Sequence, residues 1–104
     1  MSKGKFLYIA KMDIAPEHEA LFNHLYDHEH IPAFLKVPGV LDVERGVLIE
    51  TKNEGLPKYA AIYHLDSADV IKKPEWRAAA DTGEWAPKIR PHTYNRIHAL
   101  YRKA

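Results

Sequence analysis

The segment from Lys5 to Asp13 constrains the fold most, because the first half of this predicted strand has no polar face. Alternate apolar residues fall on its two sides, Phe6, Tyr8, Ala10 and Met12 on one and Leu7 and Ile9 on the other. A sheet that packs on one side only shows apolar positions alternating with polar ones. The strand is therefore expected in the middle of a sheet that is covered on both sides.

The residues after this strand predict one helix, from Pro16 to about His30. Proline fits the first turn of a helix, where its missing N–H is not needed. Four apolar residues then recur at helical spacing and form one buried stripe, Leu21, Phe22, Leu25 and Tyr26. Because Pro32 disfavours helical geometry in the residue before it, the helix is expected to end there, with 33–37 as an irregular turn.

The next two strands are expected to form a hairpin. Val40 to Thr51 is the first, with four apolar residues in phase, Leu41, Val43, Val47 and Ile49. The segment 53–57 has turn composition. Lys58 to Leu65 then returns as the second strand of the hairpin, with apolar residues on both of its faces.

The last part of the chain predicts a second helical region and a closing strand. Ser67 is suited to cap the helix, which Pro74 interrupts. Residues 85–91 are expected to form a connection punctuated by prolines, and Thr93 to Arg102 alternates as a strand does.

The order strand, helix, strand, strand, helix, strand indicates a single α+β domain over residues 1–104. It favours a four-stranded antiparallel sheet with both helices on one face, the βαββαβ arrangement. The other face then needs cover, and the residues expected there are largely apolar. The sequence therefore predicts a symmetric homodimer in which a second copy stacks on this face.

The composition excludes several classes of function. The chain has no cysteine, and its two serines, Ser2 and Ser67, lie at a terminus and at a predicted helix cap, so neither a thiolate site nor a serine triad is expected. A formal net charge of +1 gives no field that would attract nucleic acid or a membrane surface. No segment has the length of a membrane span or a signal sequence, which predicts a cytoplasmic protein.

Histidine is unusually frequent, with seven in the chain. His24 and His28 are spaced as two metal ligands on one helix face would be, but solvated surface side chains are the favoured interpretation of this pair. We therefore expect no metal. No glycine-rich loop suited to phosphate is present, and no cofactor is expected.

Glu29 and His30 are the strongest candidates for chemistry. Glu29 falls on the apolar stripe of the helix, where a carboxylate needs a partner or a cavity; an ordinary pairing with a nearby lysine or histidine is the alternative. His30 stands where the helix is expected to stop, and an imidazole there suits general acid–base catalysis near neutral pH.

The motif Tyr26-Asp27-His28-Glu29-His30-Ile31-Pro32, followed by Val37-Pro38-Gly39-Val40, carries a resemblance to a known family. The chain resembles the dimeric α/β-barrel superfamily, and within it the EthD-like proteins. The resemblance implies a ferredoxin-like domain that dimerises through its sheets into a barrel with a cavity in each half. Relatives include cofactor-free monooxygenases, polyketide cyclases, muconolactone isomerases and haem-degrading enzymes, and the residues that match the motif are His30 and Pro32.

The resulting expectation is a small cofactor-independent enzyme that acts by acid–base chemistry on a hydrophobic, aromatic or lactone-like metabolite. His30 is the expected acid or base, and Glu29 is expected to orient it. Isomerisation, cyclisation, decarboxylation and oxygenation stay open. Seven residues are candidates for binding substrate, Tyr8, Tyr63, His64, Trp85, His92, Tyr94 and His98.

The alternative is a non-catalytic module that binds a ligand or serves assembly with the same dimeric fold. The size of the cavity separates the two hypotheses. An enclosed space of roughly 300 Å³ or more with His30 on its wall would favour an enzyme or a ligand carrier.

Overall fold

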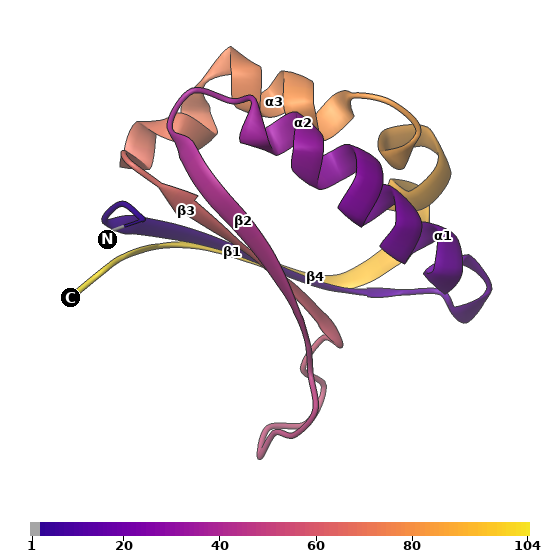
Figure 1. Cartoon of the computed structure of the whole chain (residues 1–104). Helices are drawn as coiled ribbons and strands as arrows, with labels where there is room; N and C mark the ends of the chain where they lie inside the picture. Colours follow the sequence, from indigo (N-terminus) through magenta and orange to yellow (C-terminus); the bar gives the residue numbers. More distant parts are fainter. Residues whose placement is uncertain (1–2) are drawn as a thin grey trace.

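The computed structural model describes residues 3–104 and contains one antiparallel sheet under a layer of helices (Figure 1). The strands are β1 (Phe6–Ile14), β2 (Val40–Val47), β3 (Tyr59–Leu65) and β4 (Thr93–Arg102). Their order across the sheet is β2-β3-β1-β4, with each neighbouring pair antiparallel. The predicted fold class and the central position of the first strand are confirmed.

The first helix does not stop at Pro32, so the predicted end of this helix is wrong. A short 3₁₀ turn (Pro16–His18) leads into α1 (Glu19–Leu25), a π-helical segment η2 (Tyr26–His30) and α2 (Ile31–Leu35) without interruption. The Ile31 N–H donates to the Tyr26 carbonyl five residues back, which is the wide turn of a π-helix. Pro32 then occupies the first turn of α2, where it needs no donor.

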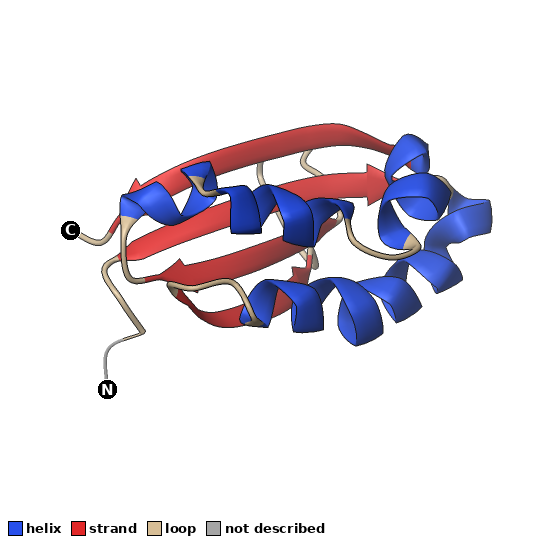
Figure 2. Ribbon diagram, turned by 90° about the horizontal axis from the view of Figure 1, so that it is seen from above, coloured by secondary structure: helices blue, strands red, loops and turns tan. Residues whose placement is uncertain are grey.

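The second helical layer is longer than the sequence indicates. It comprises η3 (Ala68–Lys72), α3 (Pro74–Asp81), the π-helical η4 (Trp85–Ile89) and η5 (Arg90–His92). Residues 85–91, predicted as a connection, are therefore helical. All these helices lie on one face of the sheet (Figure 2).

The second strand differs from its prediction in length and in phase. β2 ends at Val47, and a register shift between Val40 and Asp42 interrupts its pairing with β3. Val40 and Val43 are buried although they are three residues apart, whereas three members of the predicted stripe are exposed, Leu41, Val47 and Ile49. The irregular pairing changes which side chains reach the core.

A bulge in β4 shapes the end of the sheet near the helices. Ile97 pairs with Lys11 and Tyr94 pairs with Asp13, so two residues, Asn95 and Arg96, lie opposite one. Asn95 has a φ of 52°, the left-handed conformation that bulged residues often adopt. Its side-chain amide donates to Asp13 at 3.0 Å and to the Gly55 carbonyl at 2.8 Å, which holds the irregular backbone in place.

The core lies between the helices and one face of the sheet, where four side chains are completely buried, Phe22, Leu65, Val70 and Ile89. The opposite face has no helix over it (Figure 1). Tyr94, Ile97 and Tyr101 of β4 are 54%, 48% and 53% exposed. Within residues 3–104, no helix has the length and apolar character to span a membrane. The cytoplasmic location stays a prediction.

Candidate functional site

His30 is enclosed by aromatic rings beneath the first helix. Its ring centroid lies 4.4 Å from that of Trp85, 4.8 Å from Tyr26 and 4.9 Å from Phe34. The residue is only 6% exposed, and within residues 3–104 its buried Nδ1 has no hydrogen-bond partner. Buried polar atoms are normally paired, so this covered nitrogen is an unsatisfied polar atom within the aromatic cluster.

The surroundings of His30 favour its neutral form. Burial is the main cause that lowers its pKa from 6.5 to about 3, and the positive charges of Arg90 and Arg96 lower it further. The imidazole is therefore uncharged at neutral pH. Its unpaired nitrogen either accepts or donates a hydrogen bond, according to the tautomer.

A small pocket of about 80 Å³ lies beside His30. Aromatic residues form most of its wall, Tyr8, Tyr26, Phe34, Tyr63, Trp76 and Trp85. The pocket is smaller than the roughly 300 Å³ of enclosed space that would favour an enzyme or a ligand carrier, so a single chain does not meet this criterion. It adjoins a larger open cleft of about 800 Å³, however, with which it shares lining residues that include Tyr8, Trp76, Arg96 and His98.

The phenol groups at the pocket keep their protons. The hydroxyls of Tyr26 and Tyr63 lie 2.9 Å apart in a hydrogen bond. Burial raises the pKa of Tyr26 to about 12 and that of Tyr63 well above its usual range. Burial also raises the pKa of Tyr8, whose ring packs at right angles on Trp76 at 5.2 Å. These rings supply an apolar wall and neutral hydroxyls, rather than a base.

Arg96 gives the pocket a positive charge. Its field lowers the pKa of both His30 and His98, in each case after burial, which is the larger cause. Arg90 also reaches the pocket, but it is held by Asp81 at 2.9 Å and by the Ala80 carbonyl. Arg96, by contrast, has no hydrogen bond or ion pair with the part of the chain that the structure describes.

The structure brings four of the predicted substrate-binding residues to this pocket, Tyr8, Tyr63, Trp85 and His98. It does not bring the other three. His64 lies on the opposite face of the sheet, where Nε2 is 2.7 Å from a Glu44 oxygen. Tyr94 pairs with Asp13 before the bulge, which turns it to that same face. His92 stacks on His18 at 3.7 Å, outside the pocket lining.

Glu29 is not a pocket residue, so its predicted place beside the reacting group is not what the structure shows. Its carboxylate accepts a hydrogen bond from the backbone N–H of Trp85 at 2.8 Å. Gly83 lies directly against it, and a Cβ at Gly83 would come within 2.4 Å of the carboxyl carbon. Glu29 thereby fixes the start of η4 and the position of Trp85, which covers His30.

The sequence interpretation missed Arg90, Arg96 and Trp76 as pocket residues. The polar segment around Arg90 and Arg96 was a visible signal, since a plain connection needs few charged groups. Arg96 lies on the same face as His98 by ordinary alternation, whereas the face of Tyr94 is set by the bulge, which depends on pairing between distant strands. The position of the bulge could not be read from the spacing within β4.

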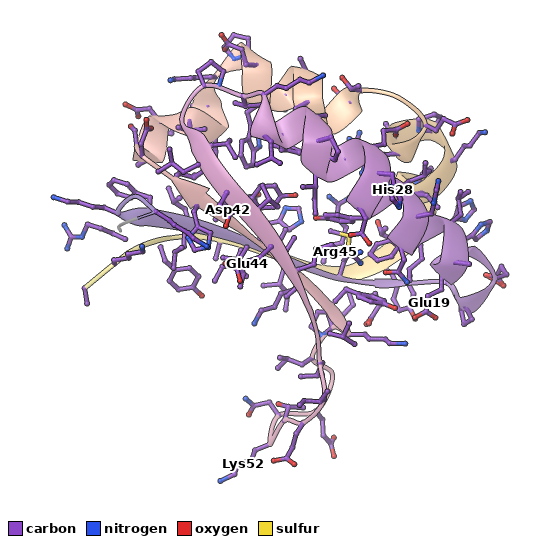
Figure 3. All side chains as sticks on the ribbon, viewed as in Figure 1. Glu19, His28, Asp42, Glu44, Arg45 and Lys52 are labelled. Carbon is purple, nitrogen blue, oxygen red and sulfur yellow. The ribbon has the colours of Figure 1, made fainter. Side chains whose placement is uncertain are left out.

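A second cluster of polar residues lies on the face without helices. Asp42, Glu44 and His64 place ligand atoms within 4.8 Å of one another, and two of them are labelled on β2 in Figure 3. Lys3 pairs with Asp42 at 2.8 Å, and Glu44 pairs with His64. These contacts satisfy the charges without an ion. The rings of His24 and His28 lie 4.7 Å apart on exposed residues.

Comparison with known proteins gives matches among solved structures only. No protein-family model matches the chain, and no curated protein matches its sequence. A putative antibiotic biosynthesis monooxygenase from Bordetella bronchiseptica superposes with a TM-score of 0.73, 20% identity and coverage of 97% of this chain and 98% of the other. An EthD family protein from Bacillus halodurans superposes with a TM-score of 0.68 at 15% identity, and the match covers 96% of this chain and 99% of the other.

A third solved structure is described as a dimeric protein of unknown function with a ferredoxin-like fold, from Bacteroides fragilis. It superposes with a TM-score of 0.61 at 20% identity, and the match covers 95% of this chain and 96% of the other. Identities this low establish shared architecture rather than shared activity. The chain thus has the ferredoxin-like fold of EthD family proteins and of monooxygenase-like proteins, as its sequence motif predicts.

Proposed function

We propose that this protein is a small cofactor-independent enzyme that moves a proton on a hydrophobic, aromatic or lactone-like substrate. The observation that carries the proposal is the shared pocket of His30 and Arg96: a neutral, unpaired imidazole and an unpaired cation face one largely apolar space. This is the pair that proton abstraction needs, a base and a positive charge for the anion that forms.

In the proposed step, His30 accepts a proton from an acidic C–H or O–H group of the substrate. The electron pair of the broken bond stays on the substrate as an enolate or phenolate, and Arg96 stabilises its oxygen. Arg90 and Arg96 are among the causes that keep the imidazole neutral. The anion that forms beside the ring offsets these two charges and stabilises the imidazolium as it forms, although the larger contribution of burial remains.

The remaining pocket residues hold the substrate. Rings such as Tyr8 and Trp76 provide faces and edges for a flat molecule. Glu29 acts as a positioning residue through its hydrogen bond to the Trp85 N–H. Returning the proton to another atom of the substrate gives an isomerisation. Attack of the anion on a carbonyl carbon of the same molecule, with the proton returned to the alkoxide oxygen, gives a cyclisation. Addition of the anion to O₂, with the proton returned to the peroxide oxygen, gives an oxygenation.

We also propose that the working form is a homodimer. The face of the sheet without helices carries a patch of apolar side chains from β1, β3 and β4, namely Leu7, Ile9, Ile62, Ile97, Ala99 and Tyr101. An exposed patch of this kind on a small domain is a typical protein interface. The dimeric description of the Bacteroides fragilis neighbour supports a second copy as the occupant.

The proposed chemistry is tested by hydrogen exchange with solvent. The protein is incubated in D₂O with a panel of enolisable aromatic ketones, phenols and lactones, and deuterium uptake at carbon is followed by NMR. We expect exchange of at least one compound above the background rate, and its loss in His30→Asn. Asparagine keeps a polar atom near the position of Nδ1 but cannot act as a base.

His28→Asn is the matched control, because His28 is an exposed histidine of the same segment (Figure 3). It should exchange as the wild type does. Undiminished exchange in folded His30→Asn would show that His30 is not the base. No exchange with any compound would leave the binding module as the better interpretation.

A further inference from the structure

The open cleft beside the pocket is strongly cationic. Five basic side chains line it, Lys72, Lys73, Arg77, Arg90 and Arg96, against one carboxylate, Asp81. These six residues carry a formal charge of +4, whereas the whole chain carries only +1. The positive charge of the molecule is therefore gathered at the mouth of the pocket.

Most of these cations lack counter-ions within the molecule. Only Arg90 is paired, with Asp81. For the other four, no hydrogen bond or ion pair of the side chain is found within residues 3–104. Lys3, Lys58 and Lys88, which lie elsewhere, each have an acidic partner within 2.8 Å. Several like charges around one open cleft make its potential positive, which favours the binding of an anion there.

The cleft and the pocket form one continuous space. Tyr8, Trp76 and His98 line both. The outer cleft, at about 800 Å³, has room for a substituent much larger than the inner pocket at about 80 Å³. A single molecule thus meets two environments, an aromatic one at His30 and a cationic one outside.

We propose that the cleft is an anion-binding subsite, and that the substrate is an organic acid with an apolar ring at His30 and a carboxylate among the five basic residues that line the cleft. This inference rests on the proposed function for the orientation of the substrate. Arginine and lysine side chains suit a carboxylate, and several of them in one cleft add their fields. The same field draws an anionic substrate toward the site.

A matched pair of probes tests the subsite, 3-phenylpropionate and its neutral amide 3-phenylpropanamide. Isothermal titration calorimetry of the wild-type protein at low salt should show the acid binding roughly tenfold more tightly than the amide, about 1.4 kcal/mol. Raising the ionic strength to about 0.5 M should weaken the binding of the acid and leave the binding of the amide unchanged, because salt screens charge.

Variants locate the effect. Lys73→Gln and Arg77→Gln are each expected to lower the affinity for the acid by roughly two- to fivefold without changing the affinity for the amide. Lys52→Gln removes the same charge from the tip of the β2–β3 loop, far from the cleft, and should have no effect (Figure 3). Neither Lys73 nor Arg77 lines the inner pocket.

Equal affinities for the two probes would overturn the inference, as would an equal loss in Lys52→Gln or no binding of either probe. The exchange experiment with His30→Asn is independent of these results. Preference for the acid without any exchange would remove the proposed chemistry but keep the subsite. Exchange without preference for the acid would keep the proposed chemistry and remove the subsite.

Discussion

At the scale of single residues, His30 has a buried, unpaired nitrogen that lowers the stability of the fold. A buried nitrogen without a partner loses its hydration and gains nothing in return. Three aromatic neighbours hold the ring in place. Packing alone does not need the imidazole, because a phenylalanine would fill the same space without an unpaired nitrogen.

Replacing His30 with phenylalanine should therefore stabilise the fold. The ring shape is kept and the unpaired nitrogen is removed, which is expected to raise the free energy of unfolding by about 1 kcal/mol. For a domain of this size that corresponds to a rise in Tm of roughly 4–8 °C in scanning calorimetry. A lower Tm would indicate that Nδ1 has a structural partner, such as a bound water.

The pH dependence of stability should carry the signature of His30. Its pKa is about 3 when folded and 6.5 in the unfolded chain, so the unfolded state binds more protons between these values. Stability then falls as the pH drops from 6.5 toward 3, by at most about 1.4 kcal/mol per pH unit from this group. Urea titrations of the wild type and His30→Phe should diverge over this window. Parallel curves of unfolding free energy against pH for the two proteins would contradict the lowered pKa of His30.

The sequence could predict His30 but not its partner in the pocket. The histidine belongs to a short motif on one helix, which is local information. Arg96 alternates in step with His98, but the face that these two residues share is set by the pairing between β1 and β4, which the spacing within β4 does not give. His64 shows the opposite error, since alternation places it on a strand but not on a face.

At the scale of elements, two π-helical segments build the site together. Tyr26–His30 supplies His30, and Trp85–Ile89 supplies the indole that covers it. Neither segment follows from periodicity, because both contain a wide turn and a nearby proline that suggests a break. The Glu29 carboxylate links the two segments, because it accepts a hydrogen bond from the backbone N–H of Trp85.

Substitution of Gly83 tests this connection. Gly83 and Gly55 both have a left-handed φ, 72° and 78°, so alanine is strained at either position. Only at Gly83 would the added Cβ meet the Glu29 carboxylate; at Gly55 nothing lies within 4 Å. Gly83→Ala should destabilise the fold more than Gly55→Ala, which is expected to cost about 1 kcal/mol.

Tryptophan fluorescence separates the two glycine variants further. Displacement of the Glu29 carboxylate in Gly83→Ala should loosen Trp85 and shift its emission to the red, while Gly55→Ala leaves it unchanged. Equal losses of stability in urea titrations and identical spectra would show that Glu29 moves aside freely and does not position Trp85.

At the scale of the whole molecule, the sheet separates two surfaces with different tasks. The helices cover one face of the sheet (Figure 2). The pocket lies on that side, and apolar side chains such as Ile97 and Tyr101 are exposed on the other face. The order of elements and the apolar character of both faces of β1 were enough to predict this division. The exact composition of each face depends on the register shifts in β2 and β4.

A charge on the exposed face should dissociate the proposed dimer. Ile97 lies on this face and is 48% exposed, as is Leu35 of α2 on the helical side. Sedimentation velocity is expected to show a dimer for the wild type and for Leu35→Lys, and a monomer for Ile97→Lys. A wild-type monomer, or an Ile97→Lys dimer, would contradict the proposed interface.

The bulge in β4 also divides one strand between those two surfaces. In an uninterrupted strand, Tyr94, Arg96 and His98 would all point the same way. The additional residue inverts the alternation at Asn95, so Tyr94 belongs to the exposed face and Arg96 to the pocket. A single-codon deletion at Asn95 would make the pairing regular, with Arg96 opposite Met12 and Tyr94 still opposite Asp13, and both side chains would keep their faces. The length of the strand at this point can therefore vary without exchanging the two surfaces, and what Asn95 adds is its contacts with Asp13 and Gly55.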